Sequence, residues 1–485
     1  MALWTLPGSG VSVAGMTHTV ELPLWLLILI LLFAAVTAAT HLLFPSVRWF
    51  FRRRAERVVA RLNERLQRPI QPFKLLRRQD MIQRVIYDPD VMRAARGYAV
   101  ENGVREDVAF ERAQDYAREI VPSFSATAYF GFATRAARFL STKLFHVELH
   151  RPDPEVLNGI DPDATVVFVM NHRSNFDYVL VTYLTADQSA LSYAVGEWAR
   201  VWPLSRLIRA MGGYFIRRKY RNELYRTVLS TYVQRATEAG VTQAVFPEGG
   251  LSRTGAIGQP KLGILSYIVE AWSPEGRDVV FVPVAFNYDR VVEDRILVAA
   301  RRDPKRRFKA SAPEGVRFTL RYLRRRLQGA EGRFGVASVA YGKPVSLKAE
   351  AVPDRDDLVP HLAETLMRGL KDVVPLVTTP LVMASLLARG GAGTLEEVIA
   401  GIEDLLADVP EGVPNDAAAL EDTETIRAVL DVLVMREIVA LEDGVYRVVE
   451  TDLAVYYANS IRHHLAANAA LTIPDTPTSG ESETK

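Results

Sequence analysis

One histidine and one aspartate stand five residues apart, directly after an apolar run. His172 and Asp177 lie in the stretch NHRSNFD, which follows VVFVM. Positions five apart in a regular helix lie about 140° apart around its axis, so the two side chains cannot meet within one helix. They can meet if His172 lies on a strand-to-helix turn and Asp177 lies in the first helical turn. The carboxylate would then hold one imidazole nitrogen and leave the other free as a general base.

The same residues also permit a purely structural interpretation. Ser174 and Asp177 have a spacing like that of a capping box, in which the acidic side chain only favours the start of a helix. Taken alone, the His–Asp spacing favours this interpretation over the catalytic one. Three further motifs in the chain reverse that balance.

Each of the three motifs follows a strand-like run. GGYFIRR ends in Arg217 and Arg218, and guanidinium groups suit phosphate because their donors are planar and bidentate. FPEGGLSRTG carries Glu248 and Arg253 among glycines, which permit a tight turn with backbone N–H groups beside an anion. The fourth motif, VPVAFNYDRVVE, combines Pro283 with charged residues at its end. Each motif alone could be a turn or a solvated charge cluster.

In this order, the four motifs resemble the four-block signature of the glycerolipid acyltransferases. They are most similar to the glycerol-3-phosphate/dihydroxyacetone-phosphate O-acyltransferase branch, and the resemblance runs from about Ser123 to His464. It implies that His172, oriented by Asp177, takes the proton of an acceptor hydroxyl as that hydroxyl attacks the thioester of acyl-CoA or acyl-carrier protein. It implies no metal and no cofactor beyond this co-substrate. The substrate-binding residues that it implies are Arg217, Arg218, Glu248, Gly249, Gly250, Ser252, Arg253, Lys261 and Pro283.

The reaction implied by the resemblance transfers a fatty acyl group to the sn-1 hydroxyl of glycerol 3-phosphate. The product would be lysophosphatidic acid, in the first step of phospholipid biosynthesis. Glu248 and the backbone near Gly249 would position the glycerol hydroxyls, and the phosphate would be bound by Arg217, Arg218, Arg253 and Lys261. One position departs from the pattern: Leu251 stands where the branch usually carries an arginine linked to the phosphate of the acceptor. Two other acceptors, 1-acylglycerol 3-phosphate and dihydroxyacetone phosphate, therefore stay open.

Composition excludes several other chemistries. The 485 residues include no cysteine, which rules out disulfides, cysteine-ligated zinc, iron–sulfur clusters and a thiol nucleophile. A net charge of +2 gives no overall attraction to nucleic acid. Ser252 lies in GLSRTG, one residue longer than a nucleophile elbow, which argues against a serine hydrolase. His463 and His464 are adjacent and are expected to point apart on a helix surface, so they predict no metal site.

A single apolar segment precedes the four motifs. Residues 22–44 carry no formal charge, and a helix of this length reaches about 35 Å, enough to cross a hydrocarbon core of about 30 Å. Basic residues follow from Arg48 and none precedes the segment, which predicts a single-pass anchor in the cell membrane. The catalytic part would lie on the cytoplasmic face, near membrane lipids. A cleaved signal peptide is the competing interpretation, although it normally has a basic leader and a shorter apolar core.

Short β-rich runs alternate with helix-length segments in the middle of the chain. The runs are Thr165–Met170, Thr242–Phe246, Val279–Val284 and Ala337–Ala340. This alternation predicts an α/β fold with a mixed, mostly parallel sheet flanked by helices. The resemblance implies that this is the glycerolipid acyltransferase fold.

The C-terminal part has a different pattern of predicted helices and strands. A helix over Thr425–Met435 leads into two β runs around Asp443 and Gly444, which resembles a winged helix. A membrane-tethered winged-helix regulator is therefore the alternative from another class, although this region is acidic whereas DNA-binding surfaces are basic. The predicted organisation is a short extracytoplasmic N-terminus (1–21), a transmembrane helix (22–44), a helical region (48–155), the acyltransferase domain (156–350), a helical, winged-helix-like region (351–468) and a disordered tail (469–485).

Overall fold

The computed structural model describes residues 26–32, 53, 56–150, 159–186, 189–196, 199–202, 204–217, 222–302, 334–350 and 355–465. The chain divides into two compact units, 1–64 and 65–485. In the first unit, residues 26–32 form a helix whose apolar side chains are exposed. Most of the predicted membrane helix over 22–44 lies outside the described residues. Among the residues that are described, no helix has both the length and the apolar character that a membrane span requires.

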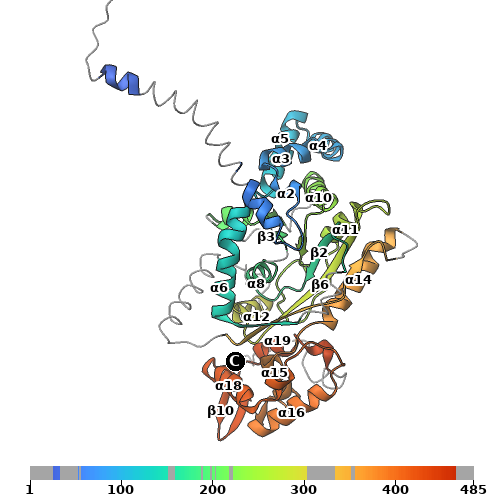
Figure 1. The fold of residues 1–485 in the computed structure, drawn as a ribbon. Helices are drawn as coiled ribbons and strands as arrows, with labels where there is room; N and C mark the ends of the chain where they lie inside the picture. The colour runs from blue at the N-terminus through green and yellow to red at the C-terminus, as the bar shows by residue number, and fades with distance from the viewer. Residues whose placement is uncertain are drawn as a thin grey trace, which may run out of the picture. The chain divides into compact units, whose positions relative to one another are not determined.

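An eight-stranded sheet forms the centre of the second unit (Figure 1). Its strands are β1 (His146–His150), β2 (Thr165–Met170), β3 (Ser192–Gly196), β4 (Gly213–Ile216), β5 (Gln243–Val245), β6 (Val279–Tyr288), β7 (Val336–Tyr341) and β8 (Val345–Ser346). Seven strands follow the order β1-β7-β6-β2-β5-β3-β4, and β8 pairs with β6 off this path. β6 is antiparallel to β7 and β8, whereas the other described pairs are parallel. The prediction of a mixed, mostly parallel sheet is therefore confirmed.

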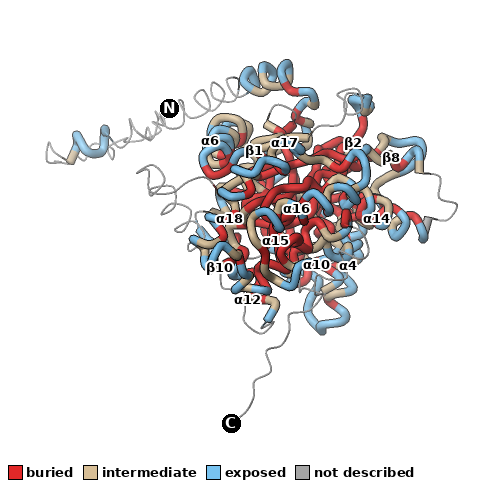
Figure 2. Tube along the Cα trace, turned by 90° about the horizontal axis from the view of Figure 1, so that it is seen from below, coloured by how far each residue is buried: buried red, intermediate tan, exposed pale blue. Residues whose placement is uncertain are grey.

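The central strand β2 shows why the sheet is buried on both faces. Val166, Phe168 and Met170 belong to one apolar core, whereas Val167 and Val169 belong to another. Side chains alternate between the two faces of a strand, and a strand covered on both faces has a continuous apolar sequence. The predicted strand over TVVFVM coincides with β2 and is buried throughout. Figure 2 shows this buried centre and the exposed outer sides of the helices around it.

Helices supply the other half of each apolar core. One core contains residues of α3 (Arg78–Ile86), α4 (Pro89–Asn102), α5 (Glu106–Ile120), α10 (Glu223–Glu238), α11 (Gly263–Glu270) and α14 (Arg355–Asp372). The other contains residues of α6 (Thr134–Leu144), α8 (Asp177–Leu184) and α12 (Asp294–Arg302). The α/β part also contains the short helices α2 (Pro72–Leu75) and α9 (Leu204–Ala210) and the π-helix η1 (Thr127–Ala133).

The C-terminal region consists of helices and a small three-stranded sheet, and its likeness to a winged helix stays a prediction. Their order is α15 (Thr378–Ala388), β9 (Ala392–Thr394), α16 (Leu395–Ala407), α17 (Ala417–Glu421), α18 (Thr423–Met435), β10 (Val439–Glu442), β11 (Val445–Val448) and α19 (Thr451–Ala458). The predicted hairpin is confirmed, with φ of 51° at Asp443 and 79° at Gly444, as a tight two-residue turn requires. This region shares the apolar core of α6, α8 and α12, so it packs directly against the α/β part.

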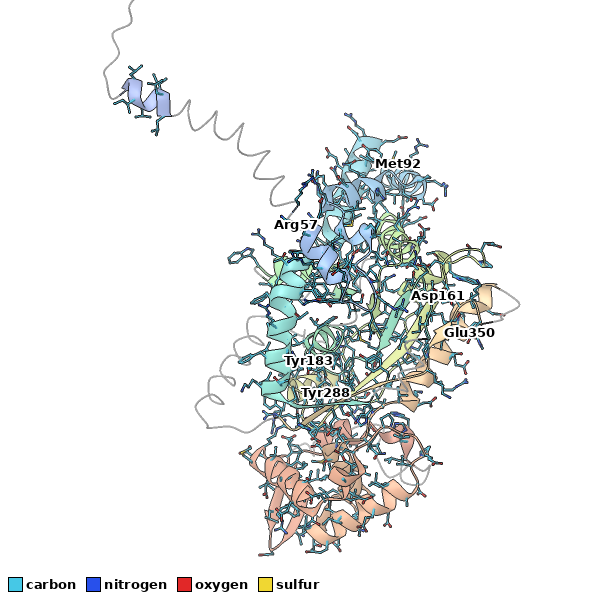
Figure 3. The ribbon with its side chains drawn as sticks, in the orientation of Figure 1. Arg57, Met92, Asp161, Tyr183, Tyr288 and Glu350 are labelled. Atoms are coloured by element: carbon cyan, nitrogen blue, oxygen red, sulfur yellow. The ribbon has the colours of Figure 1, made fainter. Side chains whose placement is uncertain are left out.

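The carboxyl ends of β2, β4, β5 and β6 lie at the same edge of the sheet. Figure 3 labels Asp161, which precedes β2, and Tyr288, the last residue of β6, at opposite ends of these strands. His172, Arg217 and Glu248 follow β2, β4 and β5 respectively. Open α/β sheets bind ligands beyond the carboxyl ends of their strands. The topology thus brings the sequence motifs to one edge.

Candidate active site

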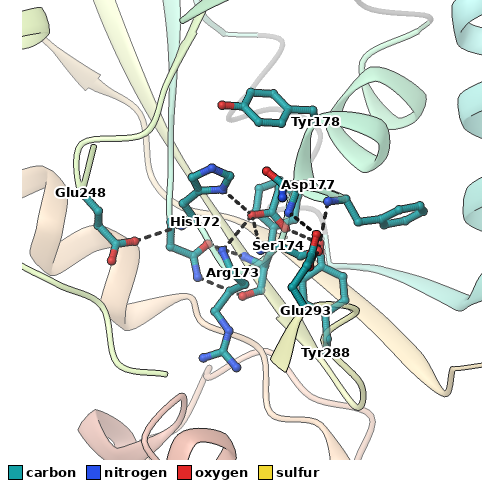
Figure 4. A network of polar contacts seen from close by, with 12 residues as sticks. His172, Arg173, Ser174, Asp177, Tyr178, Glu248, Tyr288 and Glu293 are labelled. Atoms are coloured by element: carbon teal, nitrogen blue, oxygen red, sulfur yellow. Dashed lines mark hydrogen bonds and ion pairs between the residues drawn. The ribbon is translucent and has the colours of Figure 1, made fainter. Parts of the chain in front are cut away.

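His172 and Asp177 meet on the turn between β2 and α8 (Figure 4). Nδ1 of His172 lies 2.9 Å from Oδ2 of Asp177, and the two side chains are 2% and 0% exposed. β2 ends at Met170 and α8 begins at Asp177, so the predicted strand-to-helix geometry is confirmed. An ionised aspartate fixes the imidazole proton on Nδ1, which leaves Nε2 with a lone pair that can accept a proton.

Further donors hold the Asp177 carboxylate. Oδ2 accepts the backbone N–H groups of Arg173 and Ser174 at 2.8 and 3.0 Å, and Oδ1 accepts the Tyr288 hydroxyl at 2.5 Å. Donors of this number stabilise a carboxylate in its charged form and fix its direction. Burial and the neighbouring Asp177 raise the pKa of Tyr288 well above its ordinary value, so the phenol stays a donor. Tyr288 is not among the predicted site residues, and its position in the fourth motif is the only sequence signal that points to it.

Glu293 supports the same turn from the fourth motif. The Ser174 hydroxyl donates to its Oε2 at 2.6 Å, and the backbone N–H of Asn175 donates to its Oε1 at 3.3 Å. Burial raises the pKa of Glu293, with Asp177 adding to the shift and the bonds from Ser174 and Asn175 opposing it. This contact and that of Tyr288 join the first and fourth motifs, which the sequence separates by more than a hundred residues.

Glu248 joins the third motif to the turn between β2 and α8. Its Oε1 accepts the backbone N–H of His172 at 2.9 Å, and its Oε2 accepts that of Gly258 at 2.9 Å. Burial raises the pKa of Glu248, and these two N–H groups oppose the shift. The next residue, Gly249, has φ of 66°, and a Cβ there would lie 2.7 Å from Cδ of Lys261. Glycine at this position therefore lets the Lys261 side chain lie against the loop.

Ser252 shapes the loop of the third motif. Its backbone N–H donates to the carbonyl of His172 at 2.8 Å. Its hydroxyl donates to the carbonyl of Ala256 at 2.7 Å and accepts the backbone N–H of Gly255 at 3.1 Å. The hydroxyl therefore shapes the loop itself, and the backbone N–H holds the loop against the turn that carries His172. Gly250 lies in the same loop and is half-buried.

Other predicted substrate-binding residues lie elsewhere. Arg253 is exposed, and its Nη1 lies 3.4 Å from the carbonyl of Ala300 in α12. Pro283 lies inside β6, in register with Val169 of β2. Arg218 lies outside the described residues. The role of these residues in substrate binding stays a prediction.

Arg217 is bound by a carboxylate from α5. Its Nε and Nη2 donate to Oε1 and Oε2 of Glu119 at 2.7 and 2.5 Å, and Arg200 donates to Oε1 at 2.7 Å. Glu119 is 7% exposed, so one buried carboxylate serves two guanidinium groups and leaves an excess of positive charge. Arg217 follows β4, three strands and about 14 Å across the sheet from β2. Glu119 is not among the predicted site residues, because no local sequence feature distinguishes it from the other glutamates of this mixed-charge helix.

Aromatic side chains surround the imidazole of His172. The ring of Phe246 stacks on it with centroids 4.2 Å apart, and Tyr178 presents an edge at 5.4 Å. Apolar walls keep water from the base and strengthen its electrostatic contacts. The side chain of His172 is 2% exposed, so these aromatic rings and the surrounding turn enclose most of the imidazole.

The prediction that His463 and His464 point apart on a helix surface is wrong. They lie on the 3-10 turn η3 (Arg462–His464), where their ring centroids are 4.2 Å apart, and His464 is buried. Their Nε2 atoms bind the carbonyls of Lys371 and Val374 at 3.0 and 2.9 Å, which ties this turn to the end of α14. Within the described ranges, no cluster of three His, Cys, Asp or Glu side chains is placed to hold a metal ion.

Two family models match the chain. An acyltransferase model matches residues 151–287, and a model of the glycerol-3-phosphate acyltransferase C-terminal region matches residues 312–473. Similar curated proteins include the glycerol-3-phosphate acyltransferase of Ectopseudomonas mendocina (strain ymp), 26% identical over 81% of this chain and 50% of that protein. That of Shewanella woodyi is 27% identical over 84% of this chain and 52% of that protein. The chain thus spans about half the length of the curated relatives it matches.

A solved structure is also similar in part. The 1-acyl-sn-glycerophosphate acyltransferase of Thermotoga maritima matches 50% of this chain and 77% of that chain, with 20% identity and a TM-score of 0.31. The two family models together cover the turn that carries His172 and the C-terminal region. The chain therefore contains an acyltransferase domain, followed by a region similar to the C-terminal region of glycerol-3-phosphate acyltransferases.

Proposed function

We propose that this chain transfers a fatty acyl group from acyl-CoA or acyl-carrier protein to the sn-1 hydroxyl of glycerol 3-phosphate. The observation that carries the proposal is the buried contact between His172 and Asp177 at the carboxyl edge of the sheet. The two family models and the names of the curated relatives support the choice of glycerol 3-phosphate as the acceptor. The product is lysophosphatidic acid.

The reaction is a direct transfer. Asp177 holds the Nδ1–H of His172, and Nε2 accepts the hydroxyl proton as the glycerol oxygen attacks the thioester carbonyl carbon. The carbon–sulfur bond then breaks, and the leaving thiolate accepts this proton from the imidazole. No acyl-enzyme is needed because the thioester is already activated, and the step uses no metal or further cofactor.

Lys261 is the basic candidate best placed for the phosphate of the acceptor. Its side chain lies against Gly249, which follows the Glu248 that binds the His172 backbone. Arg217 is held by Glu119 several strands away, and Arg253 lies toward α12. We therefore assign the phosphate first to Lys261 and the loop N–H groups, with Arg217 as a second, longer-range cation.

The substrates place this reaction at a membrane surface. Long-chain acyl donors and the lysophosphatidic acid product partition into lipid, so we propose that the enzyme works on the cytoplasmic face of the cell membrane. The apolar segment over 22–44, followed by arginines from Arg48 onwards, supports this location.

An acyl-transfer assay on purified membranes tests the proposal. Three acceptors are compared: glycerol 3-phosphate, dihydroxyacetone phosphate and 1-acylglycerol 3-phosphate. We expect glycerol 3-phosphate to be preferred, and His172→Ala to lower kcat by roughly 10²–10⁴-fold because the general base is lost. His150→Ala is the matched control, since His150 lies on β1 and binds Ser338. Near-normal transfer by His172→Ala would contradict the mechanism, and preference for another acceptor would contradict the substrate.

A further inference from the structure

Arg173, the residue after the catalytic histidine, contacts two parts of the molecule at once. Its backbone N–H donates to Asp177, whereas its side chain points away from the imidazole (Figure 4). The guanidinium donates through Nη1 to the carbonyl of Gly255 and lies 5.1 Å from the ring centroid of Tyr456 in α19. A single buried residue therefore connects the catalytic carboxylate to the C-terminal region.

The guanidinium of Arg173 is incompletely paired. Its Nε and Nη2 are buried and have no hydrogen-bond partner among the residues that the structure describes, and the same holds for the hydroxyl of Tyr456. Burying unpaired polar groups destabilises a protein, and an apolar side chain of similar size would avoid that penalty. Local departures of this kind are typical of functional sites. The arrangement favours a role for Arg173 beyond packing.

The helix α19 lies so close to the third motif that there is no room for a side chain at position 255, which is a glycine. Gly255 has φ of 86°, and a Cβ there would lie 1.8 Å from the carbonyl oxygen of Tyr456. Nδ2 of Asn459 also donates to the carbonyl of Thr254 at 3.0 Å. The loop that receives these contacts is the one whose Ser252 N–H binds the backbone of the catalytic histidine.

A second contact joins the same helix to the fourth motif. The Tyr457 hydroxyl donates to Asp294 at 2.6 Å and accepts the backbone N–H of Val291 at 3.2 Å, and Arg436 also donates to Asp294. This contact stabilises the interface, but it does not reach the hydrogen bonds of Asp177. Tyr457 can therefore serve as a control for Tyr456, because both residues lie on α19 and only Tyr456 contacts Arg173.

We propose that α19 is part of the support of the active site and that Arg173 is the positioning residue through which it acts. The Tyr456 ring and the Gly255 carbonyl hold the guanidinium, which fixes the backbone N–H that orients Asp177. The inference rests on the proposed acyl transfer. Because Arg173 acts through Asp177 and does not contact the acceptor, its loss should lower kcat and leave KM for the acceptor unchanged.

The experiment measures kcat and KM for the full chain in membranes. We expect Arg173→Lys and Tyr456→Leu each to lower kcat by roughly 10- to 100-fold, since small displacements of catalytic groups have effects of this size. KM for glycerol 3-phosphate should stay within about twofold. Tyr456→Phe keeps the aromatic face and loses only an unpaired hydroxyl, so it should keep wild-type kcat. The double variant should be no slower than the slower single one, because contacting residues that act as a unit are not additive.

Tyr457→Phe is the matched control for general weakening of the interface. It should lower the thermal midpoint and keep kcat, because it leaves Arg173 in place. Wild-type kcat in Tyr456→Leu would overturn the inference, even if Arg173→Lys fails to fold. Equal loss of kcat in Tyr457→Phe would also overturn it. A wild-type chain that acylates none of the three acceptors would instead contradict the proposed function, and the inference with it.

Discussion

The two ends of the parallel strands both bury a basic side chain, but they pair it differently. At the amino end, Nζ of Lys74 in α2 donates to the carbonyls of Ala190 and Leu191 at 2.7 and 2.6 Å, and lies 4.6 Å from the ring centroid of Phe124. At the carboxyl end, two nitrogens of Arg173 have no hydrogen-bond partner within the described part of the chain. Both side chains are almost fully buried.

The difference separates structural burial from functional burial. Lys74 has partners that explain its position, since it ties α2 to the start of β3 through two carbonyl oxygens. At the turn between β2 and α8, by contrast, several donors bind Asp177, whereas two nitrogens of the neighbouring Arg173 have no partner among the described residues. Buried polar groups are normally paired, so incomplete pairing next to a general base indicates a site under functional constraint.

The largest expected effect comes from Asp177→Asn at the carboxyl end. The amide can still accept the Tyr288 hydroxyl, but it carries no charge to hold the imidazole proton on Nδ1. We expect kcat to fall by roughly 10³–10⁴-fold, as in triads that lose this carboxylate. Initial rates at saturating substrate measure the change, and thermal unfolding shows whether the fold persists. A variant that keeps more than a tenth of wild-type kcat would show that the carboxylate is structural only.

Glu119→Gln should have a smaller effect, because it acts at β4 rather than at β2. Removing this charge frees Arg217 and Arg200 from their carboxylate and raises the local positive potential. If Arg217 is the second phosphate ligand, KM for glycerol 3-phosphate should fall a few-fold while kcat stays the same.

The salt dependence of KM provides a second measurement for Glu119→Gln. We expect KM to rise more steeply with ionic strength in the variant than in the wild type, because the net positive charge around Arg217 is larger by one. An unchanged KM at every salt concentration would remove Arg217 from the acceptor site.

The sequence predicted those features that depend on neighbouring residues. The strand β2, the turn between His172 and Asp177, and the hairpin at Asp443 follow from short-range patterns of apolar residues and turn formers. The motifs also indicated the edge of the sheet at which the site lies, because parallel strands share their carboxyl ends.

The remaining parts of the site depend on contacts between distant residues. The Tyr288 hydroxyl reaches Asp177 across 111 positions, and Arg217 reaches Glu119 across 98. Which helix lies beside the end of a strand is decided by packing of the whole core. Local patterns do not encode that choice, so Glu119 and Tyr456 could not be identified from them.

The smallest expected effect on activity comes from Lys74→Met at the amino end, which should leave kcat unchanged. Burial lowers the pKa of Lys74 in the folded state well below its ordinary value of 10.5. At any pH between the lowered pKa and 10.5, the unfolded state therefore binds more protons than the folded state. The free energy of unfolding of the wild type should therefore rise with pH in that window, by at most about 1.4 kcal/mol per unit. Methionine removes this dependence and leaves two carbonyl oxygens unpaired, a penalty of about 1–3 kcal/mol for each unpaired group.

Thermal midpoints at pH 7, 8 and 9 test this difference between the two ends. The gap between the wild type and Lys74→Met should widen as the pH rises, because the wild type gains stability and the variant does not. Lys143→Met on the exposed side of α6 is the matched control and should show no such trend. A constant gap would mean that Lys74 keeps its proton on folding. A loss of kcat would mean that the amino end contributes to the site, and the distinction between the two ends would fail.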